Sequence, residues 1–334
     1  MKKILITGGL GYIGSHTVIK VIENGYEPII VDNLSNSQKS VHKKLEKIAG
    51  RSIVFYEGDL SDKNFLDTMF SEHEIESVIH FAAFKAVGES MEKPLKYFSN
   101  NVTSMINLLE IMNKFESKNF IFSSSCTIYG QPESIPVSED AEIQPAQSPY
   151  GETKQTCEKI LNYCSKADDL KVVCLRYFNP IGAHSSMEIG ELPIGVPQNL
   201  VPFICQSAAG KRGNIKIWGN DYNTPDGTAI RDYIDINDLA EAHVCAVLRQ
   251  DQFKKNFNVF NIGSGEGRSV LEIIKTFEEI NKLKLNYEFS NRRPGDVEQI
   301  FCDPTNAKKS LKWTARTSID ESLKTAWKWQ GKIK

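Results

Sequence analysis

Three side chains in the middle of the chain have the types and the spacing that proton transfer requires. Ser125 follows the short apolar run 119–123, and further along the chain Tyr150 and Lys154 form a Tyr-x-x-x-Lys pattern. Residues four positions apart lie on one face of a helix. Tyrosine has a pKa of about 10, so it acts as a base at neutral pH only beside positive charge, which Lys154 would supply. The pattern therefore predicts Tyr150 as a general base, with the Ser125 hydroxyl as a proton relay.

Ser148 and Pro149 indicate where the helix that carries Tyr150 begins. Serine is a preferred N-cap and proline a preferred first helical residue, so Tyr150 is expected in the first turn, where the helix dipole favours an anion. Taken alone, a Tyr-x-x-x-Lys pattern is more often a solvated helix face. The catalytic interpretation is favoured here by the serine-tipped run before it and by the glycine-rich start of the chain.

The start of the chain has the spacing of a dinucleotide-binding loop. Residues 8–14 are Gly-Gly-Leu-Gly-Tyr-Ile-Gly, directly after an apolar run and before a helical pattern. Glycines allow a tight turn and the close approach of a pyrophosphate, and the N-terminus of the following helix supplies N–H donors. Asp32, which ends the next apolar run, suits the hydroxyls of an adenosine ribose and favours NAD over NADP because it repels a 2′-phosphate. We therefore predict an NAD site here.

Residues that follow two later apolar runs extend the predicted cofactor site. One offers a carboxylate for an adenine amino group next to an apolar side chain, and the other offers small residues where backbone passes close to a cofactor. They are Asp59 with Leu60, and Phe81 with Ala82 and Ala83. Each pattern alone fits a loop acid or a core filler equally well.

The elements that must position these residues alternate regularly through the first half of the chain. Short runs rich in Ile, Val and Phe predict buried strands, and helix-length stretches separate them. The runs are 4–7, 28–32, 53–57, 77–81, 119–123 and 172–177. This alternation predicts right-handed βαβ units and a doubly wound parallel sheet of Rossmann type. Because ligands bind at the carboxyl ends of the strands in such a sheet, the candidate residues are expected to share one edge.

From about residue 182 the pattern changes to loops punctuated by proline and glycine, with short strands and two helical patterns. We therefore predict an α/β protein with an NAD-binding Rossmann domain over 1–181 and a smaller mixed α/β substrate lobe over 182–334. Some crossing of the chain between the lobes is expected. The cleft between them is the predicted substrate site.

The composition favours binding of a small ligand over binding to nucleic acid or to a membrane surface. The 334 residues include 40 Lys plus Arg and 42 Asp plus Glu, for a net charge of −2. Such a balance gives no field that collects nucleic acid or membrane, and no run approaches the roughly 18 apolar residues of a membrane span. The seven cysteines lack a C-x-x-C pair and the six histidines lack a ligand motif. We expect a cytoplasmic protein with reduced thiols and no metal.

These motifs together resemble the extended short-chain dehydrogenase/reductase family, and within it the UDP-hexose 4-epimerases. The match runs from end to end, and its most specific stretches are 11–17, 32–37, 85–90, 175–184 and 226–233. The resemblance implies tightly bound NAD that is regenerated in each turnover. It also implies reversible 4-epimerisation of UDP-galactose and UDP-glucose through a 4-keto sugar, the chemistry of the Leloir pathway of galactose metabolism.

The resemblance extends the predicted site to individual positions. With the residues predicted above, it implies an NAD site of Gly8, Gly11, Tyr12, Ile13, Gly14, Asp32, Asn33, Asn36, Ser37, Asp59, Leu60, Phe81, Ala82, Ala83, Lys85, Asn100, Ser123, Tyr150, Lys154, Tyr177 and Phe178. It implies a UDP-sugar site of Ser125, Tyr150, Asn179, Asn199, Leu200, Lys216, Ile217, Trp218, Arg231, Tyr233, Arg293, Asp296 and Ile300. Arg231 and Arg293 would neutralise the diphosphate, and Asp296 would bind ribose hydroxyls. Without the resemblance, Arg292 and Arg293 would be interpreted as a surface basic pair.

One position bears on the sugar that is accepted. At Ile300, members of the family carry either tyrosine or a smaller residue beside the sugar 2-position, and the smaller choice accompanies acceptance of N-acetylated sugars. Isoleucine is intermediate in size. We therefore expect UDP-glucose and UDP-galactose as the principal pair, with a side activity on UDP-GlcNAc and UDP-GalNAc.

Other members of the extended family are the nearest alternatives. Nucleotide-sugar 4,6-dehydratases of this type carry an Asp-Glu pair after the fifth strand, whereas this chain has Cys126 and Thr127 after Ser125. A UDP-glucuronate decarboxylase and a non-catalytic NAD sensor on the same fold are further alternatives. Retention of Ser125, Tyr150 and Lys154 disfavours the sensor.

Relatives pair as homodimers through helices around 93–115 and 149–167, although the apolar stripes in these segments are equally explained by packing on the sheet.

Overall fold

The structure, a computed structural model, describes residues 1–293 and 295–333. At its centre is a parallel seven-stranded sheet with the order β10-β6-β5-β4-β1-β2-β3. The strands are β1 (Lys3–Thr7), β2 (Glu27–Asp32), β3 (Val54–Glu57), β4 (Ile75–His80), β5 (Asn119–Ser123), β6 (Lys171–Tyr177) and β10 (Phe257–Ile262). The strand order changes direction between β1 and β4, the position at which doubly wound sheets bind ligands. The predicted Rossmann-type α/β fold is confirmed.

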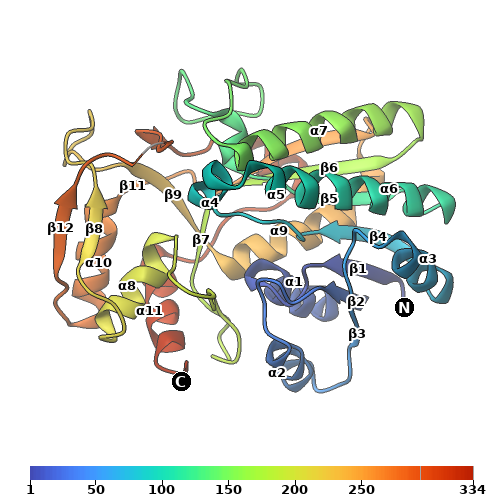
Figure 1. The fold of residues 1–334 in the computed structure, drawn as a ribbon, viewed down its shortest axis with the longest axis horizontal. Coiled ribbons are helices and arrows are strands. Elements are labelled where there is room, and N and C mark those ends of the chain that lie inside the picture. Colours follow the sequence, from blue (N-terminus) through green and yellow to red (C-terminus); the bar gives the residue numbers. More distant parts are fainter. Residues whose placement is uncertain (294, 334) are drawn as a thin grey trace.

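Helices cover both faces of this sheet (Figure 1). One face is covered by α1 (Tyr12–Glu23), α2 (Ser40–Ala49) and α9 (Ile236–Arg249), the other by α3 (Lys63–Glu72), α6 (Ser104–Lys114) and α7 (Pro149–Ala167). Successive strand residues point to opposite faces. Ile4 and Ile6 therefore belong to one core cluster and Leu5 to the other. Burial on both sides explains why the runs of the inner strands are apolar throughout. The run 53–57 was also predicted as a buried strand, but β3 lies at the edge of the sheet and is partly exposed, with Val54 37% exposed.

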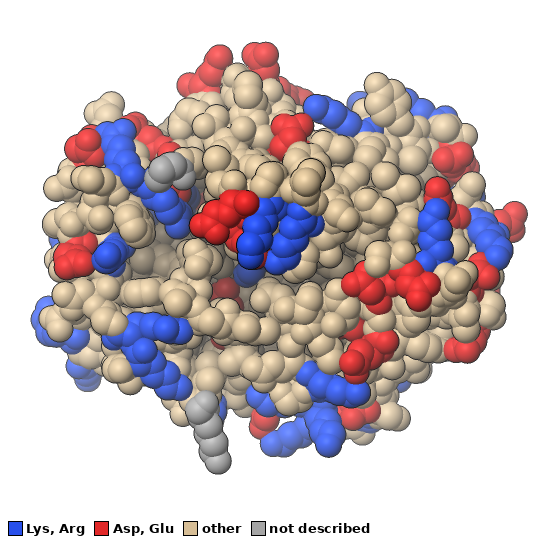
Figure 2. All heavy atoms as spheres, viewed as in Figure 1, with Lys and Arg blue, Asp and Glu red and all other residues tan. Residues whose placement is uncertain are grey.

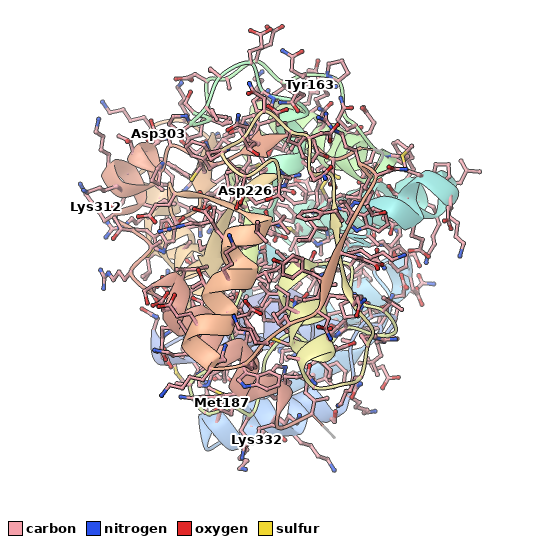
Figure 3. The ribbon with its side chains drawn as sticks, turned by 90° about the vertical axis from the view of Figure 1, so that its left-hand side faces the viewer. Tyr163, Met187, Asp226, Asp303, Lys312 and Lys332 are labelled. Carbon is pink, nitrogen blue, oxygen red and sulfur yellow. The ribbon has the colours of Figure 1, made fainter. Side chains whose placement is uncertain are left out.

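The second lobe is built on smaller sheets. One contains β7 (Asn179–Ile181), β9 (Ile230–Asp235), β11 (Gly267–Ser269) and β13 (Gln299–Ile300), and the other pairs β8 (Ile215–Trp218) with β12 (Tyr287–Ser290). The helices α8 (Leu200–Ala208), α10 (Val270–Asn281) and α11 (Ile319–Gln330) supply its core. Figure 3 faces this lobe and shows Asp226 at the upper end of α10, where its carboxylate accepts a hydrogen bond from Ser269.

The chain crosses between the lobes more than once. From Asn179 onward it forms β7 to β9 in the second lobe, returns to the central sheet as α9 and β10, and then enters the second lobe again. β10 pairs with β6 along its whole length, from Phe257 opposite Val172 to Ile262 opposite Tyr177. The central sheet thus includes a strand from beyond residue 182.

Short elements connect the larger ones. They are α4 (Val87–Glu92), α5 (Pro94–Phe98), a π-helical turn (Ser99–Thr103), 3₁₀ turns (Cys126–Tyr129 and Gln250–Gln252) and a second π-helical turn (Ala307–Leu311). Among the helices in the described ranges, none is both long enough and apolar enough to cross a bilayer.

Candidate active site

The turn after β1 packs directly on the end of β4. A Cβ atom at Gly8 would lie 2.9 Å from the backbone nitrogen of Ala82, and one at Gly14 would lie 2.3 Å from the carbonyl oxygen of Gly8. Gly8 also has a φ of +68°, which side chains disfavour. Glycine is therefore required at both positions by the backbone packing alone. α1 begins just after this turn with Gly11 as its N-cap, so no side chain caps its first amides, and such amides bind anions well.

Asp32 connects the glycine turn to the loop after β2. Its carboxylate is buried and accepts hydrogen bonds from the backbone nitrogen of Leu10 at 3.0 Å, from that of Leu34 at 2.9 Å and from the Ser37 hydroxyl at 2.7 Å. A carboxylate has about four acceptor sites. The predicted ribose contact thus also organises its own loop, and one acceptor site is left for a ligand hydroxyl.

The predicted adenine-side residues lie together beyond Asp32. The Asn33 amide donates to Asp59 at 2.8 Å, and Leu60 next to it is buried. Burial raises the pKa of Asp59, but the hydrogen bonds from Asn33 and Ser61 outweigh it, so the pKa lies below its usual range. Asp59 is therefore ionised at neutral pH.

Lys154 is almost completely enclosed. Its side chain is only 4% exposed, and its ammonium donates to the carbonyl oxygen of Ser123 at 2.7 Å. The ammonium also lies 4.7 Å from the centre of the Phe122 ring and 5.9 Å from the centre of the Tyr150 ring. Burial lowers the pKa of Lys154 to about 8. The lysine therefore remains largely charged at neutral pH but begins to lose its proton just above it.

Tyr150 lies in the first turn of α7, as predicted. Ser148 is the N-cap and accepts from the backbone nitrogen of Gly151 at 3.2 Å, and Pro149 is the first helical residue. Burial raises the pKa of the Tyr150 phenol well above 10, and a hydrogen bond with the Ser125 hydroxyl opposes this effect. Burial therefore works against the phenolate that the sequence predicted for Tyr150.

The end of β6 lies beside this cluster. Tyr177 is hydrogen-bonded to Ser123, and burial raises its pKa above the usual range. Phe178 is buried against Ile300 in a small core cluster. Phe81, at the end of β4, contacts the ring of His243 with centroids 4.7 Å apart, and Tyr177 lies 6.4 Å from the same ring. Sequence reasoning missed His243, which stands in an apolar helix without any local motif.

Lys85 lies on the loop after β4, and Asn100 lies in the π-helical turn Ser99–Thr103. The Lys85 ammonium is half exposed and lies 3.4 Å from Glu191 Oε1. The same oxygen accepts from the Asn199 amide at 3.1 Å. Asn100 donates to the buried Asn101 side chain at 3.0 Å. Glu191 thus connects a predicted cofactor residue with a predicted substrate residue, although no sequence motif indicated it.

In the second lobe, two arginines converge on one carboxylate. Arg293 donates to both Asp296 oxygens at 3.1 and 2.8 Å, and Arg231 approaches the same carboxylate at 3.7 Å. Arg231 is also held by the Val297 carbonyl at 2.7 Å. The structure therefore brings together the three charged residues predicted for the nucleotide.

The alternation along β8 divides its predicted residues between two environments. Lys216 and Trp218 are exposed, Trp218 by 40%, whereas Ile217 is buried in the second-lobe core. A strand turns successive side chains to opposite faces. The Ile217 side chain therefore cannot line the cleft, and any ligand contact from this residue comes from its backbone.

The remaining predicted residues are distributed over elements of both lobes. Asn199 is the N-cap of α8 and Leu200 its first residue. Asn179 in β7 pairs with Tyr233 in β9, and Ile300 pairs with Arg231. Tyr12 and Ile13 open α1, and Asn36 is exposed on the loop after β2. Figure 2 shows the surface hollowed between the second lobe, on the left, and α4, with charges of both signs interspersed around it.

The residues after Ser125 differ from those expected of a nucleotide-sugar 4,6-dehydratase. The side chain after Ser125 is the Cys126 thiol, and the Thr127 hydroxyl donates to Ser125 Oγ at 3.0 Å. No carboxylate stands at these positions, where dehydratases of this type carry an acidic pair. Within the ranges that the structure describes, no group of three or more His, Cys, Asp and Glu side chains is arranged to hold a metal.

The fold and this cluster define a Rossmann-type enzyme with serine, tyrosine and lysine at the carboxyl edge of its sheet. The profile of the family described as GDP-mannose 4,6 dehydratase matches residues 5–326, so the chain belongs to that family. Within it, the chain groups with the UDP-glucose 4-epimerases.

Three relatives show this grouping. UDP-glucose 4-epimerase of Bacillus subtilis is 47% identical over 328 residues, 98% of this chain and 96% of the relative. The crystal structure of UDP-glucose 4-epimerase from Bifidobacterium longum in complex with NAD+ and UDP aligns with a TM-score of 0.96 and 41% identity over 99% of each chain. The UDP-Glc/GlcNAc 4-epimerase from Campylobacter jejuni aligns with a TM-score of 0.85 and 35% identity over 100% of each chain.

Proposed function

We propose that this protein is an NAD-dependent isomerase that interconverts UDP-glucose and UDP-galactose at C4 of the hexose. The observation that carries the proposal is the cluster of Tyr150, Ser125 and Lys154 at the carboxyl edge of the sheet that also carries the glycine turn. The near-full-length similarity to UDP-glucose 4-epimerases, one of them crystallised with NAD+ and UDP, supports the same reaction.

The residues at the glycine turn fit NAD. The turn admits no Cβ atom at Gly8 or Gly14, the first amides of α1 have no side-chain cap, and Asp32 stands beside them. These are the requirements of a pyrophosphate and an adenosine ribose. When bound, NAD would supply the hydride acceptor that allows oxidation and re-reduction at the sugar C4.

The protein's own side chains would then move the proton. Deprotonated Tyr150 takes the proton of the sugar 4-hydroxyl, and Ser125, already hydrogen-bonded to it, bridges the two oxygens. Lys154 stabilises the phenolate from one side. Rotation of the 4-keto sugar presents its other face, and Tyr150 returns the proton to give the opposite configuration.

The second lobe would hold UDP while the sugar rotates. Arg231 and Arg293 present planar donor forks that suit phosphate oxygens. Their convergence on Asp296 supports a shared site in which the diphosphate binds the arginines and a ribose hydroxyl binds the carboxylate. We assign this role to the second-lobe segments of residues 182–334, and NAD binding to residues 1–181.

Ile300 supports a side activity on N-acetylated UDP-sugars. It is 3% exposed, packs with Phe178 and Tyr129, and lies opposite Arg231 in the sheet. A tyrosine here would fill the space beside the sugar. Replacement Ile300→Tyr is expected to lower turnover of UDP-GlcNAc more than that of UDP-glucose, whereas the smaller change Ile300→Val should spare both. Absence of UDP-GlcNAc turnover in the unmodified protein would contradict this assignment.

We also propose a cytoplasmic homodimer. A groove between α6 and α7 is lined by Ile106, Leu109, Ile160 and Cys164, and Tyr163 on the outer side of α7 is exposed (Figure 3). Apolar surface of this kind suits a second copy of the chain. All seven cysteines are free thiols, as suits a reducing compartment. Sedimentation of the purified protein as a monomer would contradict the dimer.

The reaction itself has a direct test. The purified protein should convert UDP-galactose into UDP-glucose without added NAD, and denaturation should release NAD. Absence of interconversion in the NAD-loaded protein would overturn the proposed function.

A further inference from the structure

Three consecutive serines at the end of β5 contact three residues on one face of α7. Tyr150, Lys154 and Glu158 are spaced four residues apart and therefore share a helix face. The contacts are Ser125 with Tyr150, the Ser123 carbonyl with the Lys154 ammonium at 2.7 Å, and the Ser124 hydroxyl with Glu158 Oε1 at 2.6 Å. The first two belong to the proposed catalytic cluster, whereas the third has no part in it.

Glu158, which forms the third contact, is also paired with an arginine of the neighbouring strand β6. Arg176 in β6 donates to Glu158 Oε1 at 3.1 Å and to Oε2 at 2.7 Å, which makes a bidentate pair. Glu158 is 5% and Arg176 4% exposed. Arg176 also donates to the Tyr129 hydroxyl at 3.0 Å, which in turn donates to Asn261 at 2.7 Å. Glu158 therefore connects α7 to β5, β6 and β10 through buried hydrogen bonds.

The location of this pair distinguishes it from an ordinary core ion pair. Ser124 immediately precedes Ser125, Arg176 immediately precedes Tyr177, and Glu158 lies one turn beyond Lys154. A buried ion pair adds little net stability over apolar residues of the same volume. A bidentate pair does, however, fix the position of one element relative to another, because its geometry tolerates little sliding between them.

We infer that Glu158, held by Ser124 and Arg176, is a positioning residue that fixes the register of α7 against the end of β5. This inference rests on the proposed function. The register that Glu158 fixes places Tyr150 at Ser125 and Lys154 at the Ser123 carbonyl. An error of about 1 Å in such a placement can cost roughly 100-fold in rate.

Glu158 also supplies negative charge close to Lys154. The other titratable groups near the ammonium are Tyr150 and Cys157 on α7, Cys174 on β6 and His80 on β4. Burial lowers the pKa of Lys154, and Glu158 opposes that effect. Loss of the Glu158 charge should therefore lower the pKa of Lys154 further. As the pH is raised, the variant should then lose activity at a lower pH than the unmodified protein does.

The test is the replacement Glu158→Gln, assayed per mole of bound NAD. We expect kcat to fall about 10- to 100-fold with little change in the KM for UDP-galactose, and the alkaline limb of the kcat profile to move to lower pH. Ser124→Ala should lower kcat less and leave the limb in place, because it removes a hydrogen bond but no charge. The matched control is Ser165→Ala, which removes a buried hydroxyl from α7 far from the site and should behave like the unmodified protein.

A second variant covers the case in which Glu158→Gln does not fold. The double replacement Glu158→Leu with Arg176→Met removes both charges and should fold, since apolar replacement of a buried pair is tolerated. It should bind NAD normally and remain slow. Wild-type kcat and pH profile in either NAD-loaded variant, or a loss fully explained by lost NAD, would overturn the inference. An unmodified protein without epimerase activity would instead overturn the proposed function.

Discussion

The Lys154 ammonium lies 5.9 Å from the centre of the Tyr150 ring, yet the pKa of Tyr150 is raised well above 10. Burial opposes the phenolate more strongly than one nearby cation and the Ser125 hydrogen bond favour it. A tyrosine in this setting becomes an effective base only when a second positive charge arrives. In the proposed mechanism, proton transfer by Tyr150 therefore depends on oxidised NAD, whose nicotinamide would supply that charge.

Replacement Tyr150→Phe removes the proposed proton acceptor and leaves the ring. We expect kcat to fall by about 10² to 10⁴, while the Kd for UDP, measured by calorimetry, and the content of bound NAD stay within about twofold. The ring remains in its buried position, so the fold should be preserved. Turnover close to that of the unmodified protein would show that another group accepts the proton.

The pH dependence of kcat should report Lys154. Its pKa of about 8 lies below the usual value because burial disfavours the charged form. The charged form stabilises the phenolate, so activity is expected to fall as the pH rises through and above about 8. Lys154→Met should be slow at every pH, and its profile should lack this limb. A limb that persists in Lys154→Met would belong to a different group.

Much of the site could be predicted from sequence because it depends on local patterns. The glycine turn, the N-cap at Ser148 and the Tyr150–Lys154 face each involve residues within a few positions of one another. The runs of the inner strands could also be recognised locally, because burial on both faces of a parallel sheet makes such a run apolar from end to end.

What escaped prediction depends on contacts between distant segments. Arg176 and Glu158 form their pair only after β6 packs beside α7, and nothing around either residue signals the partner. Glu158 did continue the four-residue spacing of Tyr150 and Lys154, a signal that was present but carried no chemistry by itself. The burial of Ile217 could have been inferred from strand alternation, but only with the strand's inner face known.

The glycine turn gives a prediction about cofactor retention. A Cβ atom at Gly14 would lie 2.3 Å from the Gly8 carbonyl oxygen, so Gly14→Ala must displace the backbone that faces the pyrophosphate. We expect bound NAD to be lost on purification and activity to require added NAD. Gly213→Ala is the matched control, because a Cβ atom there meets no atom within 4 Å. Retention of NAD by Gly14→Ala would place the pyrophosphate elsewhere.

Arg293 gives a prediction about substrate affinity that separates binding from chemistry. Its guanidinium donates to both oxygens of Asp296 and is partly exposed, whereas Arg231 is more buried and also donates to the Val297 carbonyl. Hydrogen bonds to charged groups contribute about 1.5–3 kcal/mol, and each 1.4 kcal/mol corresponds to a factor of about ten in affinity. Arg293→Ala should therefore raise the KM for UDP-glucose about 10- to 100-fold with kcat nearly unchanged. Because a lone charge binds phosphate without the planar fork, Arg293→Lys should recover only part of the affinity. A fall in kcat at unchanged KM would instead assign Arg293 to the chemical step.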